Sequence, residues 1–453
     1  MNRISEEILL FVARQGNDSY IDANFYFPMN LSLIIYNALV VPILWILFHI
    51  GGVFNKKIRR GIRGRKNLFH NLQHNSDKLK GTSRIWFHAS SLGEFEQAKP
   101  IIAAIKQRYP DIDIITTFFS PSGYDNSKNY KLANLISYIP FDSPAGVKKF
   151  IRIVKPNVAV MVRYDIWPNM IYALKRNAIP MVIANATMNS TSLRTAPVIL
   201  QFHRSLYDCF AQILTVSKND TAAFQTFGTT HPVIEAIGDT RFDQVMTRSI
   251  DARNRNLLSP SLINNKKIFV IGQSWAEDDD VIIPVLLKLQ HKEESLLTIL
   301  VPHEPTVEHL EEVESKLLEK ISFIRFSEMN NYHGEKVILI DSIGVLVALY
   351  QYAHVVYIGG SFRQGIHNVL EPAVFGVPVI YGPKHTNSQE AVELAKRGGG
   401  FVIENEKELY RTLRTLLDNI AVRKQAGSIS ELFVRENCGA TDRFLQHLQP
   451  YLK

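Results

Sequence analysis

Residues 85–118 read IWFHASSLGEFEQAKPIIAAIKQRYPDIDIITTF. The apolar run at 85–89 predicts a buried strand, the helical spacing of apolar residues over 96–108 predicts a helix, and 112–118 predicts a second strand. A strand, a helix and a strand in this order form a βαβ unit, in which the two strands lie parallel. The stretch therefore predicts an α/β fold built on a parallel sheet.

The same alternation continues along the chain in two blocks. Further strands are predicted at 158–162 and 181–184 in the first block, and at 267–272, 297–301, 337–340, 354–358 and 377–381 in the second. A chain of 453 residues exceeds what one hydrophobic core usually organises. We predict two Rossmann-like, doubly wound domains at 81–245 and 260–425, followed by a C-terminal helical segment at 426–453.

Two such domains that face one another across a cleft form the glycosyltransferase architecture called GT-B, in which ligands bind at the carboxyl ends of the strands. The same tandem pattern fits nucleotide-sugar epimerases. A dinucleotide-binding oxidoreductase is disfavoured, because no GxGxxG motif follows the first strand of either domain.

The N-terminal region contains no charged residue between Asp22 and Lys56. Its apolar part is long enough to span a bilayer, which takes about 20 apolar residues. Seven Lys and Arg residues follow within the eleven positions 56–66, and they favour a cytoplasmic location and anionic headgroups. We predict a transmembrane anchor at 29–54, against a buried or interfacial hairpin as the alternative.

The flanking segments complete this prediction, with an N-terminal extension of unknown role at 1–28 and a basic juxtamembrane linker at 55–80. The basic run carries most of the formal net charge of +8, so a nucleic-acid partner is not expected. Cys209 and Cys438 form no CxxC pair, and the 14 histidines show no metal-binding spacing. We predict no metal and no cofactor.

The first candidate motif is HASSLGE at residues 88–94. A predicted strand ends there in a Ser/Gly loop and places Glu94 at the start of a helix. A carboxylate in that position can act as a general base at the mouth of a cleft. It can also simply complement the positive end of the helix, and the spacing alone favours this second reading.

The second candidate motif is HVVYIGGSFRQGIHNVLEP at residues 354–372. It predicts a strand, a glycine turn and a helix opened by His367 and Asn368. Glycines let the backbone approach a ligand, and free N–H groups at a helix start receive phosphate. Glu371 is then placed to accept hydrogen bonds from ribose hydroxyls, whereas an ordinary strand-to-helix turn capped by Asn is the alternative.

Three shorter segments follow other predicted strands of the second domain. These are residues 272–274, Pro302 with His303, and residues 343–345. Strands of one parallel sheet deliver such segments to the same edge, so their main-chain groups could contact a base in the cleft.

Taken together and in order, the motifs resemble the Kdo transferases, enzymes of lipopolysaccharide assembly that transfer 3-deoxy-D-manno-octulosonic acid (Kdo) from CMP-Kdo to the lipid A precursor. The resemblance covers about residues 29–450. Its markers are HASSLGE, TTFFSPSG at 116–123, PFD at 140–142, DIWPN at 165–169, ANA at 184–186, GDTRFD at 238–243, GGS at 359–361 and HNVLEP at 367–372.

The resemblance implies a role for each candidate residue. Glu94 would be the base that takes the proton from the acceptor hydroxyl, and Arg241, at the place of the family's lysine in K-F-D, would stabilise the transition state. CMP would be held by Pro302, His303, Ile343, Gly344, Val345, Asn368, Val369, Leu370 and Glu371. The expected reaction is an inverting, metal-independent displacement at the bacterial inner membrane, with lipid IV(A) as acceptor.

The sequence also departs from the family pattern. The family's E-T-E-L-W-P-N appears with Arg163, Tyr164 and Asp165 before Ile166, so Arg163 replaces a carboxylate thought to assist the transition state. P-R-H-P appears as PHEP at 302–305 and M-G-E as IGV, and the loop after GGS is one residue shorter.

Three readings of these departures stay open, namely a divergent subgroup, a GT-B transferase with another nucleotide sugar, and a catalytically silent, membrane-tethered binding module. The joint presence of Glu94, Arg241, Asn368 and Glu371 favours a divergent subgroup.

Overall fold

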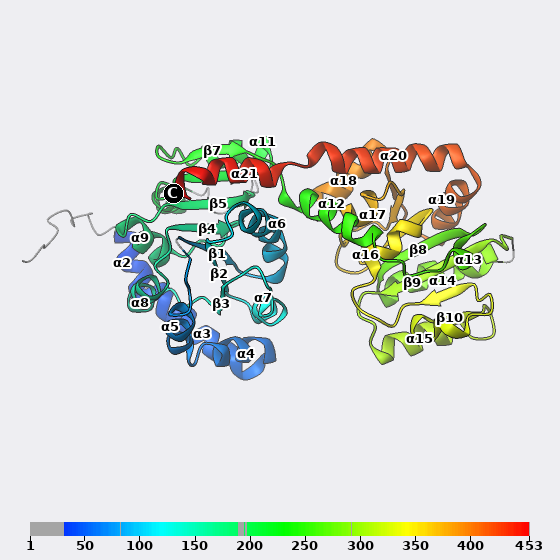
Figure 1. Ribbon diagram of the computed structural model, residues 1–453, viewed down its shortest axis with the longest axis horizontal. Helices are drawn as coiled ribbons and strands as arrows, with labels where there is room; N and C mark the ends of the chain where they lie inside the picture. Colours follow the sequence, from blue (N-terminus) through cyan, green and yellow to red (C-terminus); the bar gives the residue numbers. More distant parts are fainter. Residues whose placement is uncertain (1–30, 82, 189–193, 195–196, 291, 453) are drawn as a thin grey trace, which may run out of the picture.

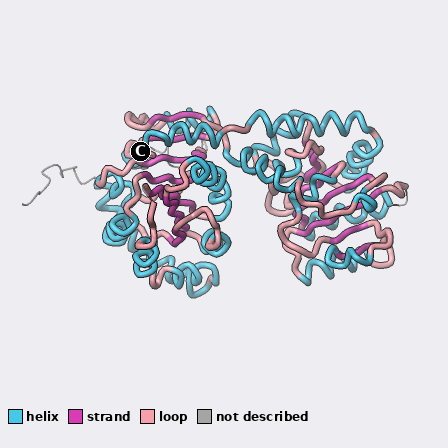
Figure 2. The backbone as a smooth tube through the Cα atoms, in the orientation of Figure 1, coloured by secondary structure: helices cyan, strands magenta, loops and turns pink. Residues whose placement is uncertain are grey.

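The computed structural model describes residues 31–81, 83–188, 194, 197–290 and 292–452. The extension predicted at 1–28 and the first two residues of the predicted anchor lie outside the described residues. Figure 1 and Figure 2 show two α/β domains side by side, each built around its own sheet. The prediction of two Rossmann-like domains is confirmed.

The first domain contains a seven-stranded sheet in the order β3-β2-β1-β4-β5-β6-β7, and all neighbouring strands are parallel. Alternate residues of β1 face opposite sides, because Trp86 belongs to one apolar cluster and Ile85 and Phe87 to another. Its strands are β1 (Arg84–Ala89), β2 (Asp113–Phe118), β3 (Leu135–Tyr138), β4 (Val158–Val162), β5 (Met181–Ala186), β6 (Gln212–Thr215) and β7 (Val233–Ala236).

Helices connect these strands and cover both faces of the sheet (Figure 1). Their starts follow from the local sequence: Ser143 Oγ accepts a hydrogen bond from Gly146 N at 3.2 Å, and Pro144 occupies the first turn of α8. The helices are α6 (Leu92–Arg108), α7 (Pro121–Ser127), α8 (Pro144–Val154), α9 (Pro168–Arg176), α10 (Pro197–Tyr207) and α11 (Lys218–Gln225).

The second domain repeats the design with a seven-stranded sheet in the order β10-β11-β9-β8-β12-β13-β14, again parallel. In β8, Val270 and Ile271 belong to the two apolar clusters on opposite faces. The strands are β8 (Lys267–Ser274), β9 (Leu296–Pro302), β10 (Phe323–Arg325), β11 (Val337–Leu339), β12 (Val355–Ile358), β13 (Val379–Tyr381) and β14 (Gly400–Val402).

The helices of the second domain include several of one turn, and these lie next to strand ends. They are α13 (Pro260–Ile263), α14 (Ala276–Gln290), α15 (Val307–Leu317), η3 (Phe326–Asn331), α16 (Leu346–Leu349), η4 (Tyr350–Tyr352), α17 (Leu370–Ala373), α18 (Gln389–Arg397) and α19 (Glu406–Asp418).

The chain passes between the domains twice. Helix α12 (Thr240–Arg253) contributes Phe242 and Val245 to the core of the second domain, while the Thr240 hydroxyl donates to Gln97 O of α6 at 2.6 Å. Helix α20 (Ile420–Asn437) runs along the second domain, and α21 (Ala440–Leu448) with η5 (Gln449–Tyr451) returns to the first (Figure 1). Phe444 in α21 lies in the core of the first domain, so the C-terminal segment completes that domain.

Residues Leu31–Phe54 form one apolar helix, made of α2 (Leu31–Ile35), the π-helical η1 (Tyr36–Val40) and α3 (Val41–Phe54). In the described part of the chain, this is the one helix long and apolar enough to cross a membrane. One side contacts the first domain. The Tyr36 hydroxyl donates to Asp142 Oδ2 at 3.0 Å, and the side chains of Asn37 and Asn169 exchange hydrogen bonds at 3.0 and 2.7 Å.

The residues predicted as a linker are helical and form α4 (Lys56–Gly64) and α5 (Leu68–Ser76). Arg65, between them, donates to Phe119 O at 2.8 Å and Ile139 O at 2.9 Å, and its guanidinium lies 4.8 Å from the ring centres of Phe119 and Tyr138. Burial lowers the pKa of Arg65 to about 10. The basic segment is therefore fixed to the first domain.

Candidate active site

Glu94 lies in the first turn of α6, at the carboxyl edge of the first sheet, and its residue is 9% exposed. Its Oε2 accepts hydrogen bonds from Ser90 N at 2.5 Å and Ser91 N at 3.2 Å, and Ser91 completes a capping box. Both bonds use Oε2, so Oε1 takes no part in the capping box. The geometry is that of a helix cap, and it still leaves one carboxylate oxygen for other contacts.

The surroundings of Glu94 set its acidity. Buried His88, at the end of β1, has Nε2 2.8 Å from Asp165 Oδ2 and Nδ1 2.9 Å from Thr117 Oγ1. Burial raises the pKa of Glu94, and the negative charge of Asp165 adds to this shift. Burial would also raise the pKa of Asp165, but its interactions with His88, together with those with Ser90 and Trp167, outweigh burial and lower it. Of the two carboxyl groups, Glu94 is therefore the stronger base.

Arg163 directly follows β4, with its backbone in the left-handed region at φ 66°. The backbone N–H of Arg163 donates a hydrogen bond to Ala184 O at 2.8 Å, and its guanidinium lies 5.5 Å from the ring centre of Tyr164. Among the described residues, its buried Nε has no hydrogen-bond partner. Leaving a buried donor unpaired costs about 1–3 kcal/mol, so a ligand oxygen at Nε would stabilise this arrangement.

Arg241 is the first-turn arginine of α12 and connects the two domains. Its Nη2 lies 2.7 Å from Asp239 Oδ2, and the same nitrogen pairs with Glu390 at the start of α18. Burial alone would lower the pKa of Arg241, but the charges of Asp239 and Glu390 outweigh burial and raise it. The predicted stabiliser is thus always charged and held at the domain boundary.

A cavity of about 480 Å³ lies at the carboxyl edge of the second sheet. This volume falls in the range typical of small-molecule sites. Its lining residues are Arg248, Asp251, Ala252, Arg255, Gln273, Val301, Pro302, His303, Pro305, Ser342, Ile343, Gly344, Leu346, Val347, Ala348 and Glu371.

The structure brings five of the nine predicted donor residues to this cavity, namely Pro302, His303, Ile343, Gly344 and Glu371. The other four lie elsewhere. The side chains of Val345, Val369 and Leu370 belong to the core of the second domain, and Asn368 Oδ1 accepts a hydrogen bond from Leu370 N at 3.1 Å.

Three residues that line the cavity each have a buried polar side-chain atom with no hydrogen-bond partner among the described residues. The atoms are Gln273 Oε1, His303 Nδ1 and Ser342 Oγ. Buried polar groups in proteins are nearly always satisfied, and an unsatisfied group calls for an explanation such as a ligand. Because all three atoms belong to residues that line one cavity, a polar ligand that reaches them there would satisfy them.

His303 lies inside an aromatic stack. Its ring centre is 4.4 Å from those of both Trp275 and His367, and Trp275 Nε1 donates to His367 Nε2 at 2.9 Å. Burial lowers the pKa of His367 to about 4, and the charge of neighbouring His303 adds to this shift. Burial also lowers the pKa of His303. Arg363 lies 4.0 Å from the Trp275 ring centre and pairs with Glu277 at 3.6 Å.

The helix predicted to open at His367 and Asn368 begins later, because α17 runs only from Leu370 to Ala373. Pro372 lies within it, and the chain reaches Gly376 at φ 73° soon afterwards. A helix of one turn has a small dipole, so the support for phosphate binding at its start is weaker than the sequence indicated.

Sequence reasoning missed the contribution of α12 to the site. Arg248, Asp251 and Arg255 line the cavity, and Arg255 Nη1 donates to Gly344 O at 2.8 Å. The sequence placed these residues in the connection between the domains, where charged side chains are typical of a solvated surface. Their spacing of three and four residues is the one available signal that they share a helix face.

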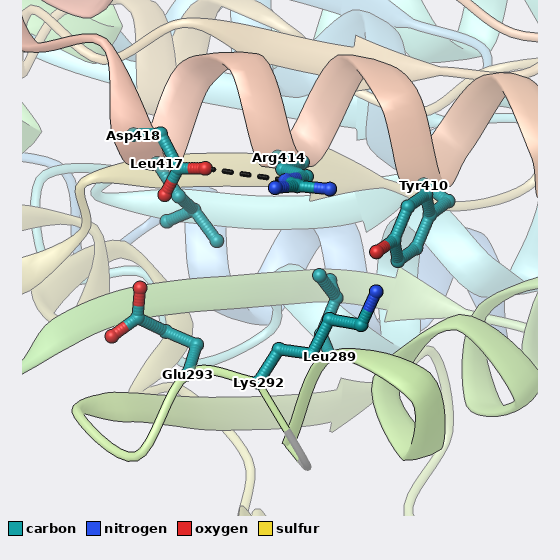
Figure 3. Close-up of a pocket in the computed structure, with 7 residues that line it drawn as sticks. All are labelled: Leu289, Lys292, Glu293, Tyr410, Arg414, Leu417 and Asp418. Atoms are coloured by element: carbon teal, nitrogen blue, oxygen red, sulfur yellow. Dashed lines mark hydrogen bonds and ion pairs between the residues drawn. The ribbon is translucent and has the colours of Figure 1, made fainter.

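A second pocket, of about 70 Å³, lies between α14 and α19 (Figure 3). Arg414 and Asp418 pair across one turn of α19 at 3.4 Å on its wall. The pocket is smaller than typical ligand sites and contains none of the predicted site residues. The larger cavity is therefore the candidate donor site.

Solved structures share this fold. The UDP-GlcNAc 2-epimerase from Neisseria meningitidis, bound to UDP-GlcNAc, matches with a TM-score of 0.57 and 14% identity, over 81% of this chain and all of that chain. The Acinetobacter baumannii MurG structure matches with a TM-score of 0.52 and 12% identity, over 81% of this chain and 99% of that one. The GT-B fold is confirmed.

Sequence comparison identifies the family. Residues 61–244 match the family model described as 3-deoxy-D-manno-octulosonic-acid transferase (kdotransferase). The 3-deoxy-D-manno-octulosonic acid transferase of Haemophilus influenzae is 31% identical over 82% of this chain and 87% of its own length, and that of Aquifex aeolicus is 28% identical over 74% and 86%. This chain is a glycosyltransferase that belongs to the 3-deoxy-D-manno-octulosonic acid transferase family.

Proposed function

We propose that the protein transfers Kdo from CMP-Kdo to the lipid A precursor lipid IV(A), at the cytoplasmic face of the bacterial inner membrane. The first domain receives the acceptor lipid and the second receives the donor. Family membership supports Kdo transfer, and the two domains present separate groups for the two substrates, Glu94 on one side and the cavity on the other.

The cavity of the second domain is the observation that carries the proposal. It joins three segments that are distant in sequence, at His303, Gly344 and Glu371, and three of its lining residues have a buried polar atom without a partner among the described residues. A cytidine offers donors and acceptors for such atoms, and its ribose hydroxyls can donate to the Glu371 carboxylate.

The proposed reaction is a single displacement. Glu94 takes the proton of the acceptor hydroxyl, the oxygen attacks the anomeric carbon of Kdo, and the bond from that carbon to the phosphate oxygen of CMP breaks. Attack opposite the leaving group inverts the anomeric configuration. Arg241 and Arg163 supply positive charge for the departing phosphate and the Kdo carboxylate, and no metal ion takes part in any step.

We propose that helix Leu31–Phe54 anchors the protein to the membrane surface, lying along the first domain with its exposed apolar side toward lipid and not crossing the bilayer, because Tyr36 near its start and Phe48 near its end both contact that domain. Tyr36 and Asn37 fasten it to the first domain, and α4 follows it with five exposed or partly exposed basic residues, which can attract anionic headgroups. The acceptor lipid could then reach Glu94 without leaving the membrane surface.

Calorimetric titration with CMP tests the donor assignment. We expect CMP to bind, and UDP and GDP to bind more weakly, while Glu371→Ala should lower the CMP affinity by about tenfold or more, because a hydrogen bond to a charged group is worth about 1.5–3 kcal/mol. Glu311→Ala, which removes an exposed carboxylate of α15 outside the cavity, is the control and should bind CMP normally. Unchanged CMP affinity in a folded Glu371→Ala protein would mean that the nucleotide binds elsewhere. Tighter binding of UDP than of CMP would mean that the donor is a UDP-sugar.

A further inference from the structure

Arg248 of α12 stands between the two halves of the site. Its Nη2 lies 2.5 Å from Glu96 Oε2 of the first domain, and its Nη1 lies 3.7 Å from Glu371 Oε1 of the second. It also lines the donor cavity. One guanidinium therefore bridges a carboxylate on the acceptor side and a carboxylate on the donor side.

The first-domain end of this bridge is well fixed. Glu96 follows Glu94 by two residues on α6, and its Oε2 accepts a second hydrogen bond, from Gln244 Nε2 of α12, at 2.7 Å. Lys99 pairs with the other oxygen of the same carboxylate. Helices α6 and α12 are thus held together next to the candidate base.

At the second-domain end of the bridge, the carboxylate of Glu371 is largely buried, and burial disfavours its charged form. The Glu371 side chain is 11% exposed, and burial raises its pKa, whereas Arg248 and Asn368 act against this shift. The other groups that face it are Glu96 of α6 and the buried Tyr350 of η4. Arg248 is the one cation among these groups, and with Asn368 it stabilises the charged form of Glu371.

We propose that Arg248 is a positioning residue that couples the two substrate sites: it holds Glu371 in place for the ribose of the donor and fixes it relative to the helix that carries Glu94. This inference rests on the proposed function, because it takes Glu371 to be the ribose-binding carboxylate. Arginine suits the role better than lysine, since its planar fork reaches two carboxylates at once.

Donor affinity should report this role. Arg248→Gln should weaken CMP binding by about tenfold, the size expected for the loss of one charge-assisted contact, and should raise the KM for the donor by a similar factor. Arg248→Lys keeps the charge and should restore most of the affinity. Arg253→Gln is the matched control, because Arg253 is exposed on the same helix and lies 5.0 Å from the Phe375 ring centre, outside the cavity.

Two further variants test the bridge itself. In a Glu371→Gln background, Arg248→Gln should change CMP affinity by less than about threefold, because coupled residues are not additive. Glu96→Gln should weaken CMP binding by about threefold, the size of a modest ion pair, although Glu96 does not line the cavity. A residue that only stabilises the fold would lower the melting temperature and leave donor affinity and KM unchanged.

The outcomes separate this inference from the proposed function. If Arg248→Gln and Arg248→Lys both bound CMP like the wild type while Glu371→Gln bound it weakly, the coupling role would be wrong and the donor site would stand. If Glu371→Gln also bound CMP normally, the donor assignment itself would fail. Thermal melting of each variant shows whether a loss reflects folding, and Glu96→Gln tests the bridge if the Arg248→Gln protein does not fold, because normal CMP binding by folded Glu96→Gln would then contradict the coupling.

Discussion

Replacing Glu94 with Gln is expected to lower the rate of Kdo transfer by about 10² to 10⁴, the usual contribution of a positioned general base. Glutamine has nearly the same shape and its amide oxygen can still accept the hydrogen bonds from Ser90 and Ser91, so the start of α6 should be preserved. The change removes the proton acceptor and little else. Turnover with CMP-Kdo and lipid acceptor, measured beside CMP affinity and melting temperature, checks this result.

Ser91→Ala is the matched control for the capping role of Glu94. It removes the serine half of the capping box and should lower stability by about 1 kcal/mol, while the carboxylate of Glu94 remains. If Glu94 serves only as a cap, Glu94→Gln should keep normal turnover, as Ser91→Ala does. Near-normal transfer by Glu94→Gln would move the base to Asp165 or His88.

Arg241→Gln should have the second-largest effect, a loss of about 10² to 10³ in turnover, because a preorganised charge at the departing group contributes about that much. CMP affinity should change less than turnover, since the charge acts mainly on the transition state. Steady-state kinetics with CMP-Kdo, alongside CMP titration, separates the two effects.

The control for Arg241 is Glu390→Gln, which breaks the link between the domains but keeps the arginine and its contact with Asp239. We expect this variant to retain turnover within about fivefold, the range of a modest ion pair. Equal losses in Arg241→Gln and Glu390→Gln would instead assign Arg241 to holding the domains together. Arg241→Gln leaves the buried Asp239 without its ion-pair partner, and a melting curve measures the resulting loss of stability.

The central strands of both sheets could be predicted from the sequence, because they are long, apolar and buried on both faces, as in β1, β4 and β8. Strands toward the edges of the sheets were missed, among them β3, β7 and β14, which have three or four residues. Runs this short carry too little periodic signal. The return of α21 to the first domain could not be predicted either, since it depends on packing between segments far apart in the sequence.

The candidate site was predictable where it depends on strand ends. Pro302 with His303 and residues 343–345 follow strands of one parallel sheet, and the structure brings members of both segments to one cavity. The arginines of α12 were not predictable as cavity residues, because a charged helix face indicates solvent unless the second domain is known to cover it. The core positions of Val369 and Leu370 likewise follow from the packing of α17.

The most direct test of the central claim is a transfer assay with the purified full-length protein in detergent, supplied with CMP-Kdo and lipid IV(A), with the products resolved by mass. The account predicts a lipid product heavier by one or more Kdo residues, formed with release of CMP, and its near absence with Glu94→Gln. Failure of folded wild-type protein to form this product, or transfer from a different nucleotide sugar in its place, would contradict the account.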